Sequence, residues 1–123
     1  MQIPSSPRFR RLSRFAFWGA LTFSVVMALL PKPPEMPTDQ LGDKFNHILA
    51  FATLAGLAAL AFPDAPRLRV IERLSFLGAM IEVAQSIPAL HRDCDMRDWV
   101  ADTVAVVVVT GIAAMIARRR ARQ

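Results

Sequence analysis

The chain alternates between long apolar stretches and short polar segments, and four of the apolar stretches are candidates to cross a membrane. They cover Phe15–Leu30, Phe45–Phe62, Leu74–Leu90 and Trp99–Ala117. As helices they would rise by roughly 24–29 Å, slightly less than a hydrocarbon core of about 30 Å. We therefore predict an all-α fold, a four-helix transmembrane bundle embedded in a lipid bilayer.

A soluble four-helix bundle is the alternative to this fold. The outward face of each helix would then carry a charged residue every few positions. No charged residue occurs in Phe15–Leu30, Phe51–Phe62 or Val104–Ala117. Apolar residues make up 54% of the chain, above the roughly 45–50% that is usual in soluble domains. Both observations favour the membrane.

Prolines and short polar residues mark where the predicted helices begin and end. Pro31 ends the first helix, and Asp43 is the predicted N-cap of the second. The third helix can begin near Pro66 and is broken at Pro88, and Asp98 is the predicted N-cap of the fourth.

Basic residues are concentrated at the two ends of the chain. Eight of the 15 lysines and arginines lie there: Arg8, Arg10, Arg11, Arg14, Arg118, Arg119, Arg120 and Arg122. An excess of basic residues marks the cytoplasmic side of a membrane protein. We predict a membrane domain over 15–117, a loose basic tail over 1–14 and a second basic tail over 118–123, with both termini cytoplasmic. The net charge of +5 then reflects membrane anchors, and we expect no nucleic-acid partner.

Polar residues next to the apolar segments all fall on the outer side of this predicted topology. They are Asp43, Lys44, His47, Glu82, Gln85, Arg92, Asp95, Asp98 and Asp102. Charge is costly at membrane depth, so such a group is a candidate functional site. Glu82 is the most informative, because it lies about two turns below the outer surface and needs a partner. Its candidate partners are Lys44, His47 and Arg92.

Acidic residues outnumber fixed bases in this group. Asp43, Glu82, Asp95, Asp98 and Asp102 face Lys44, Arg92 and Arg97. For a single buried pair, stapling of helices is the simpler interpretation. A purely structural network should however balance its charges, because uncompensated carboxylates are penalised away from water. The surplus of acid indicates protons, a cation or a cationic ligand group.

The ordered set of these motifs resembles the VanZ-like family of small membrane proteins. It consists of Asp43-Lys44-x-x-His47-x-x-x-Phe51, then Ile81-Glu82-x-x-Gln85, then Arg92-x-x-Asp95-x-x-Asp98-x-x-x-Asp102. The family often has Asn at the position of Asp102, followed by two glycines where this chain has Ala105 and Val109. The family is linked to glycopeptide susceptibility. The resemblance implies a multi-pass protein of the bacterial cytoplasmic (inner) membrane with a cell-envelope role, and it leaves the activity open.

Three functions follow as hypotheses from these residues. In a membrane enzyme, the catalytic candidates are His47, Glu82 and Asp98 as general acids, bases or electrostatic partners. The binding candidates are Lys44, Gln85, Arg92, Asp43 and Asp102, with Lys44 and Arg92 holding an anionic envelope lipid or precursor. The second hypothesis is a non-catalytic interaction module with a structural charge network. The third is lipid flipping, which would need a homo-oligomer.

We expect no cofactor and no metal ion from the local sequence pattern. No metal-ligand spacing such as H-E-x-x-H occurs, and the chain has only two histidines. A site of Asp, Glu and His side chains for a hard divalent ion stays open as an alternative.

Overall fold

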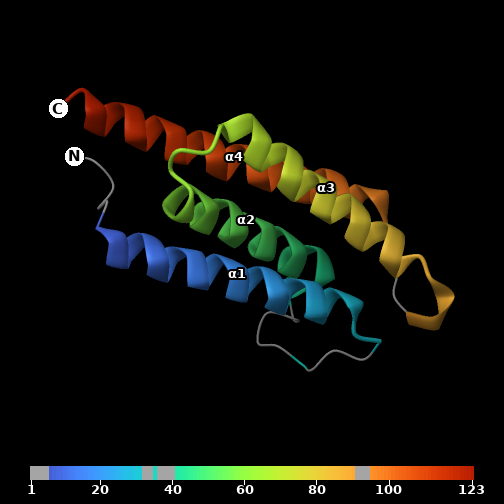
Figure 1. Ribbon diagram of the computed structural model, residues 1–123. Coiled ribbons are helices and arrows are strands. Elements are labelled where there is room, and N and C mark those ends of the chain that lie inside the picture. Colours follow the sequence, from blue (N-terminus) through green and yellow to red (C-terminus); the bar gives the residue numbers. More distant parts are fainter. Residues whose placement is uncertain (1–5, 32–34, 36–40, 91–94) are drawn as a thin grey trace.

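The computed structural model describes residues 6–31, 35, 41–90 and 95–123. These residues form no strand, and their helices are, in chain order, α1 (Pro7–Leu29), α2 (Asp43–Ala61), α3 (Arg67–Gln85), the short 3-10 helix η2 (Pro88–Leu90) and α4 (Met96–Ala121). The four α-helices run alternately up and down, so that α1 begins and α4 ends at the same end of the bundle (Figure 1). The main packing pairs are α1 with α2, α2 with α4, and α4 with α3. The predicted all-α, four-helix fold is confirmed.

Three of the helices are long and apolar enough to cross a membrane: Pro7–Leu29, Lys44–Ala61 and Met96–Ala121. The predicted span Leu74–Leu90 is not among them, because its helix, α3, ends at Gln85 and reaches 19 residues only by including charged ones. The first two turns of α3 also carry charges, which leaves only Leu74–Gln85 as its apolar part. These residues rise by about 18 Å, well short of a bilayer core.

Helix α1 begins earlier than the sequence pattern predicts. The Ser6 side chain accepts a hydrogen bond of 3.2 Å from the Phe9 amide, and Pro7 occupies the first turn. A serine N-cap followed by proline is a favourable helix start. The prediction of a loose tail over 1–14 is therefore wrong from Pro7 onward, and the arginines of this segment extend one end of α1.

The predicted caps of α2 and α4 are each displaced. Gly42, with φ at 98°, is the N-cap of α2, and Asp43 is the first helical residue. That positive φ favours glycine. Asp95 caps α4 by accepting a hydrogen bond of 2.9 Å from the Arg97 amide, so the predicted cap, Asp98, lies in the first helical turn.

Helix α2 forms the middle of the bundle. Its side chains Phe51, Leu54, Ala55, Ala58 and Ala61 are almost completely buried. The three alanines let the neighbouring helices approach closely, which is how helices pack in lipid.

The outer surface carries many large apolar side chains, among them Trp18, Phe23, Phe76, Val104 and Ile112. An exposed apolar surface of this kind would promote aggregation in water, whereas in a bilayer it contacts lipid.

A close contact among α2, α3 and α4 surrounds Gly78. A Cβ atom added to Gly78 would lie 3.3 Å from Trp99 Cδ1 and 3.4 Å from Phe51 Cζ. The Trp99 indole donates a hydrogen bond of 2.9 Å to the Ser75 carbonyl, and the Ser75 and Thr103 hydroxyls lie 2.9 Å apart. We call Phe51, Gly78 and Trp99 the apolar floor, because Gly78 and Phe51 lie one helical turn from Glu82 and His47.

Candidate functional site

Buried ionisable side chains meet at the end of the bundle where α3 ends and α2 and α4 begin, on the right in Figure 1. We call His47, Glu82, Asp98 and Asp102, with Lys44 beside them, the polar cluster. The helices position them simply: His47 lies one turn into α2, Glu82 lies in the last turn of α3, and Asp98 and Asp102 lie one turn apart in α4. Predicted site residues from three separate helices are thus brought together.

The centre of the polar cluster consists of His47, Glu82 and Asp102. Their side-chain donor atoms all lie within 4.8 Å of one another, and His47 Nδ1 lies 3.8 Å from Asp102 Oδ2. Glu82 is 1% exposed, Asp102 2% and His47 9%. An imidazole and two carboxylates therefore share a volume that is closed to solvent.

Lys44 and Asp98 form the rim of the polar cluster. Lys44 Nζ lies 3.8 Å from Asp98 Oδ1, and 51% of the lysine side chain is exposed. This distance exceeds a hydrogen bond, so the pair is held by charge. The ammonium group is thus accessible to a ligand from outside the bundle.

Glu82 has partners that differ in part from those the sequence predicts. Its Oε2 atom accepts a hydrogen bond of 3.1 Å from the Asp95 amide, which ties the end of α3 to the start of α4. His47 is its neighbour as expected, whereas Lys44 pairs with Asp98 instead. Arg92, the third expected partner, lies outside the described residues.

Gln85, a predicted binding residue, connects two helix ends. It is buried, and its Nε2 atom donates a hydrogen bond of 2.9 Å to the Ala28 carbonyl at the end of α1. The contact satisfies a carbonyl that the helix end leaves open. Asp43, another predicted binding residue, is the first residue of α2.

Buried oxygen atoms without a hydrogen-bond partner in the described part of the chain include Asp102 Oδ1 and Gln85 Oε1. Buried polar atoms in native proteins almost always have a partner, so each such atom needs a physical explanation. Asp102 Oδ1, inside the polar cluster, and Gln85 Oε1, near it, could therefore each still accept a hydrogen bond or bind a cation.

The chemistry open to this centre is proton transfer and cation binding. A carboxylate beside an imidazole orients the ring and stabilises its protonated form. Two carboxylates and an imidazole are also a ligand set for a divalent ion. The sequence pattern gave no metal motif, because these three ligands come from three helices.

Sequence reasoning missed the contacts between α3 and α4 next to the polar cluster. Ser75, Trp99 and Thr103 join α3 to α4 there. The indole N–H of a buried tryptophan needs an acceptor, so Trp99 was a recognisable signal, although the sequence does not reveal which carbonyl accepts.

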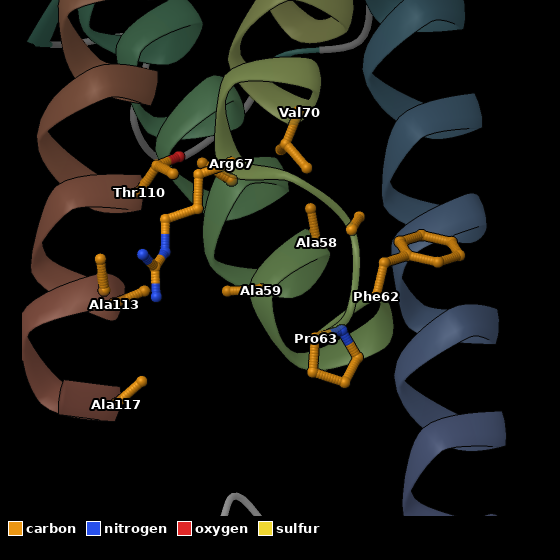
Figure 2. Close-up of a pocket in the computed structure, with 12 residues that line it drawn as sticks. Ala58, Ala59, Phe62, Pro63, Arg67, Val70, Thr110, Ala113 and Ala117 are labelled. Carbon is orange, nitrogen blue, oxygen red and sulfur yellow. The ribbon is translucent and has the colours of Figure 1, made fainter. Parts of the chain in front are cut away.

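The opposite end of the bundle contains a small cavity of about 70 Å³ between α2, α4 and the start of α3 (Figure 2). Most of its lining residues are alanines, and no carboxylate or imidazole lines it. Arg67 extends beside the cavity toward Ala113 of α4 (Figure 2). The buried Thr110 hydroxyl, which also lines it, has no hydrogen-bond partner among the described residues. This lining offers little reactive chemistry.

The membrane character of the chain and the polar cluster are thus both physical features of the structure. In comparisons with known proteins, no family model matches the chain, and neither a curated protein nor a solved structure matches it significantly. The feature that carries functional information is the burial of His47, Glu82 and Asp102 at one end of an apolar bundle.

Proposed function

We propose that the chain is an integral membrane protein that binds the anionic headgroup of a cell-envelope lipid or lipid-linked precursor at the polar cluster. The observation that carries this proposal is the convergence of His47, Glu82 and Asp102 from three helices on one buried centre. The resemblance of the motifs to the VanZ-like family supports a role in the envelope of a bacterial cell.

The cost of burial supports a ligand site over simple packing. Removing a carboxylate from water costs several kcal/mol even after the protein relaxes. The apolar floor, next to the polar cluster, joins the same three helices without any such cost. A bundle that needed only helix register could have used the same apolar packing at the polar cluster, so the buried carboxylates indicate a further role.

The two ends of the bundle support an orientation in the membrane. Arginines are concentrated at the end that holds the start of α1 and the end of α4, which includes Arg10, Arg14, Arg118, Arg119 and Arg120. We call this the basic end. By the bias of basic residues it belongs in the cytoplasm. The polar cluster then lies at the outer leaflet, where envelope precursors are used.

Each residue of the polar cluster then has a role in the proposed function. Lys44 is exposed enough to contact a phosphate or carboxylate as a point charge. If the bound group reacts, His47 is the side chain that would accept a proton, because Asp102 lies beside it to stabilise the imidazolium.

A structural charge network is the second candidate function, and specific contacts favour it. The Asp95 amide donates to Glu82, and the Gln85 amide group donates to the Ala28 carbonyl. Both contacts join helix ends. In this case the protein would be an interaction module without a ligand of its own at this position.

Lipid that copurifies with the protein separates these two functions. The full chain is purified from bacterial membranes in mild detergent, and bound lipid is identified by mass spectrometry. Lys44→Met and His47→Gln should each reduce the recovered anionic lipid at least tenfold, while Arg69→Gln at the other end of α3 should not.

Thermal unfolding of the same samples completes the test. Folded Lys44→Met and His47→Gln proteins with normal lipid recovery would contradict the proposed function. Loss of the folded state in both variants, with no specific lipid in the wild-type protein, would favour the structural network.

A further inference from the structure

The geometry points to a divalent metal-ion site in the polar cluster, with His47, Glu82 and Asp102 as its protein ligands. The inference deepens the proposed function and rests on it for the ligand that the metal would contact. A first-row transition ion such as Zn²⁺ or Mn²⁺ is the class that this ligand set fits.

The distances suit a shared ion. Ligand atoms bind these metals at about 2.0–2.2 Å, so two ligands of one ion lie roughly 3.0–4.2 Å apart. The 3.8 Å between His47 Nδ1 and Asp102 Oδ2 falls inside this range and is too long for a direct hydrogen bond between the two atoms. All three ligand atoms lie within 4.8 Å of one another, so a small side-chain movement would bring every pair into this range.

A second observation comes from Asp102 itself. The residue is 2% exposed, and its Oδ1 atom has no hydrogen-bond partner in the part of the chain that the structure describes. Since a buried carboxylate oxygen almost always has a donor or a cation beside it, the Asp102 carboxylate, whose Oδ2 atom lies near His47, still has its second oxygen available to a metal ion.

Charge balance gives an independent argument. Among the residues of the polar cluster, Lys44 offsets Asp98 at the rim. Metal ligands bind as ionised carboxylates and neutral imidazole, so Glu82, Asp102 and His47 would together offer two negative charges, which matches the charge of one divalent ion.

The ligand set also selects the type of ion. Imidazole suits zinc and other transition metals, whereas magnesium and calcium prefer oxygen ligands alone. Three protein ligands leave a coordination position open, as in catalytic rather than structural zinc sites. A phosphate oxygen could occupy that position, which explains how a cluster rich in acid would hold an anionic headgroup.

Metal binding by the full-length protein in detergent tests the inference directly. The protein is stripped with EDTA, loaded with Zn²⁺ or Mn²⁺, desalted and measured by inductively coupled plasma mass spectrometry and by calorimetry. We expect close to one ion per chain. Asp102→Asn and Glu82→Gln should each weaken binding at least tenfold.

Asp64→Asn is the matched control, because this carboxylate is 89% exposed and lies between α2 and α3 at the basic end. It should bind the metal like the wild-type protein. Equal binding by folded Asp102→Asn, Glu82→Gln and Asp64→Asn proteins, or no binding by the wild-type protein, would overturn the inference.

A spectroscopic measurement does not depend on the folding of any variant. Wild-type protein loaded with Mn²⁺ should show coupling to a ¹⁴N nucleus in pulsed electron paramagnetic resonance, because His47 is a ligand. Absence of nitrogen coupling at full occupancy would exclude the proposed ligand set.

Lipid recovery from the same stripped and reloaded samples separates this inference from the proposed function. Metal binding without any specific lipid would leave the metal site standing and remove the lipid function. Specific lipid in samples that bind no metal would support the lipid function and overturn the metal site.

Discussion

Ionisable side chains are buried at one end of the bundle and mostly exposed at the other. At the polar cluster, His47, Glu82 and Asp102 are buried between three helices. At the basic end, most arginines are exposed, and the cavity there is lined mostly by alanine. The same four helices form both ends, so the fold does not require buried charge. Charge in this bundle is therefore either left mostly at the surface, as at the basic end, or buried together with other ionisable groups, as at the polar cluster.

Arg14 illustrates how the basic end uses its charges. Its Nε atom donates a hydrogen bond of 3.2 Å to the Ala61 carbonyl at the end of α2, and its guanidinium group lies 5.5 Å from the centre of the Phe62 ring. A cation near the last carbonyls of a helix is favourable. This arginine therefore stabilises a helix end and remains close to the surface.

The largest effect that we predict is from removal of His47. His47→Leu removes the imidazole beside the buried Asp102 carboxylate, and leaving a buried charged group without one of its polar neighbours costs about 3 kcal/mol or more. The free energy of unfolding, measured in mixed micelles, should fall by that order. The matched change at the basic end, Arg69→Leu, should leave it nearly unchanged. Equal losses in both variants would remove the contrast between the two ends.

A smaller effect is expected at the apolar floor. Gly78→Leu would place side-chain atoms against Phe51 and Trp99, which already lie near van der Waals contact with a Cβ at this position. Overpacking of this kind costs about 1–3 kcal/mol and should also displace the neighbouring polar cluster. Gly19→Leu is the control, because nothing lies within 4 Å of a Cβ there. An unchanged melting temperature for Gly78→Leu would show that the three helices separate easily.

Trp99→Phe should reduce the free energy of unfolding by less than Gly78→Leu does. The change removes the 2.9 Å hydrogen bond to the Ser75 carbonyl while keeping an aromatic ring, and a hydrogen bond contributes about 0.5–1.5 kcal/mol. Trp18→Phe, on the exposed face of α1, is the control in the same unfolding measurement. A larger loss for Trp18→Phe than for Trp99→Phe would mean that α1 stabilises the bundle more than the contact between α3 and α4.

The smallest effect is expected for the ion pair at the basic end. Arg10 Nη1 and Asp64 Oδ2 lie 3.9 Å apart, and the carboxylate is largely exposed. Exposed ion pairs contribute little because water and salt screen them. Asp64→Asn should leave the melting temperature within experimental error in low and in high salt. A marked loss at low salt would show that charge pairing matters at this end too.

Several features of the fold were predictable because they depend on local sequence. The second helix was expected over Phe45–Phe62 and occupies Asp43–Ala61. Its end at Ala61, shortly before Pro63, is a direct consequence of proline chemistry. The start of α1 at Pro7 also depends on local sequence, because Ser6 is its N-cap. It was missed because the arginines that follow made residues 1–14 resemble a polar tail. The short apolar part of α3 was missed because hydropathy does not reveal where a helix ends.

Hydropathy and charge, which act residue by residue, were enough to indicate that this chain is helical, apolar on its outside, basic at its termini and polar where α2 and α4 begin. The packing of the helices was needed to bring Glu82 beside His47 and Asp102, to pair Lys44 with Asp98 and to place Gln85 at the end of α1. Such partnerships depend on how each helix is rotated and how deep it lies against its neighbours. Close packing around small residues such as Gly78 fixes both.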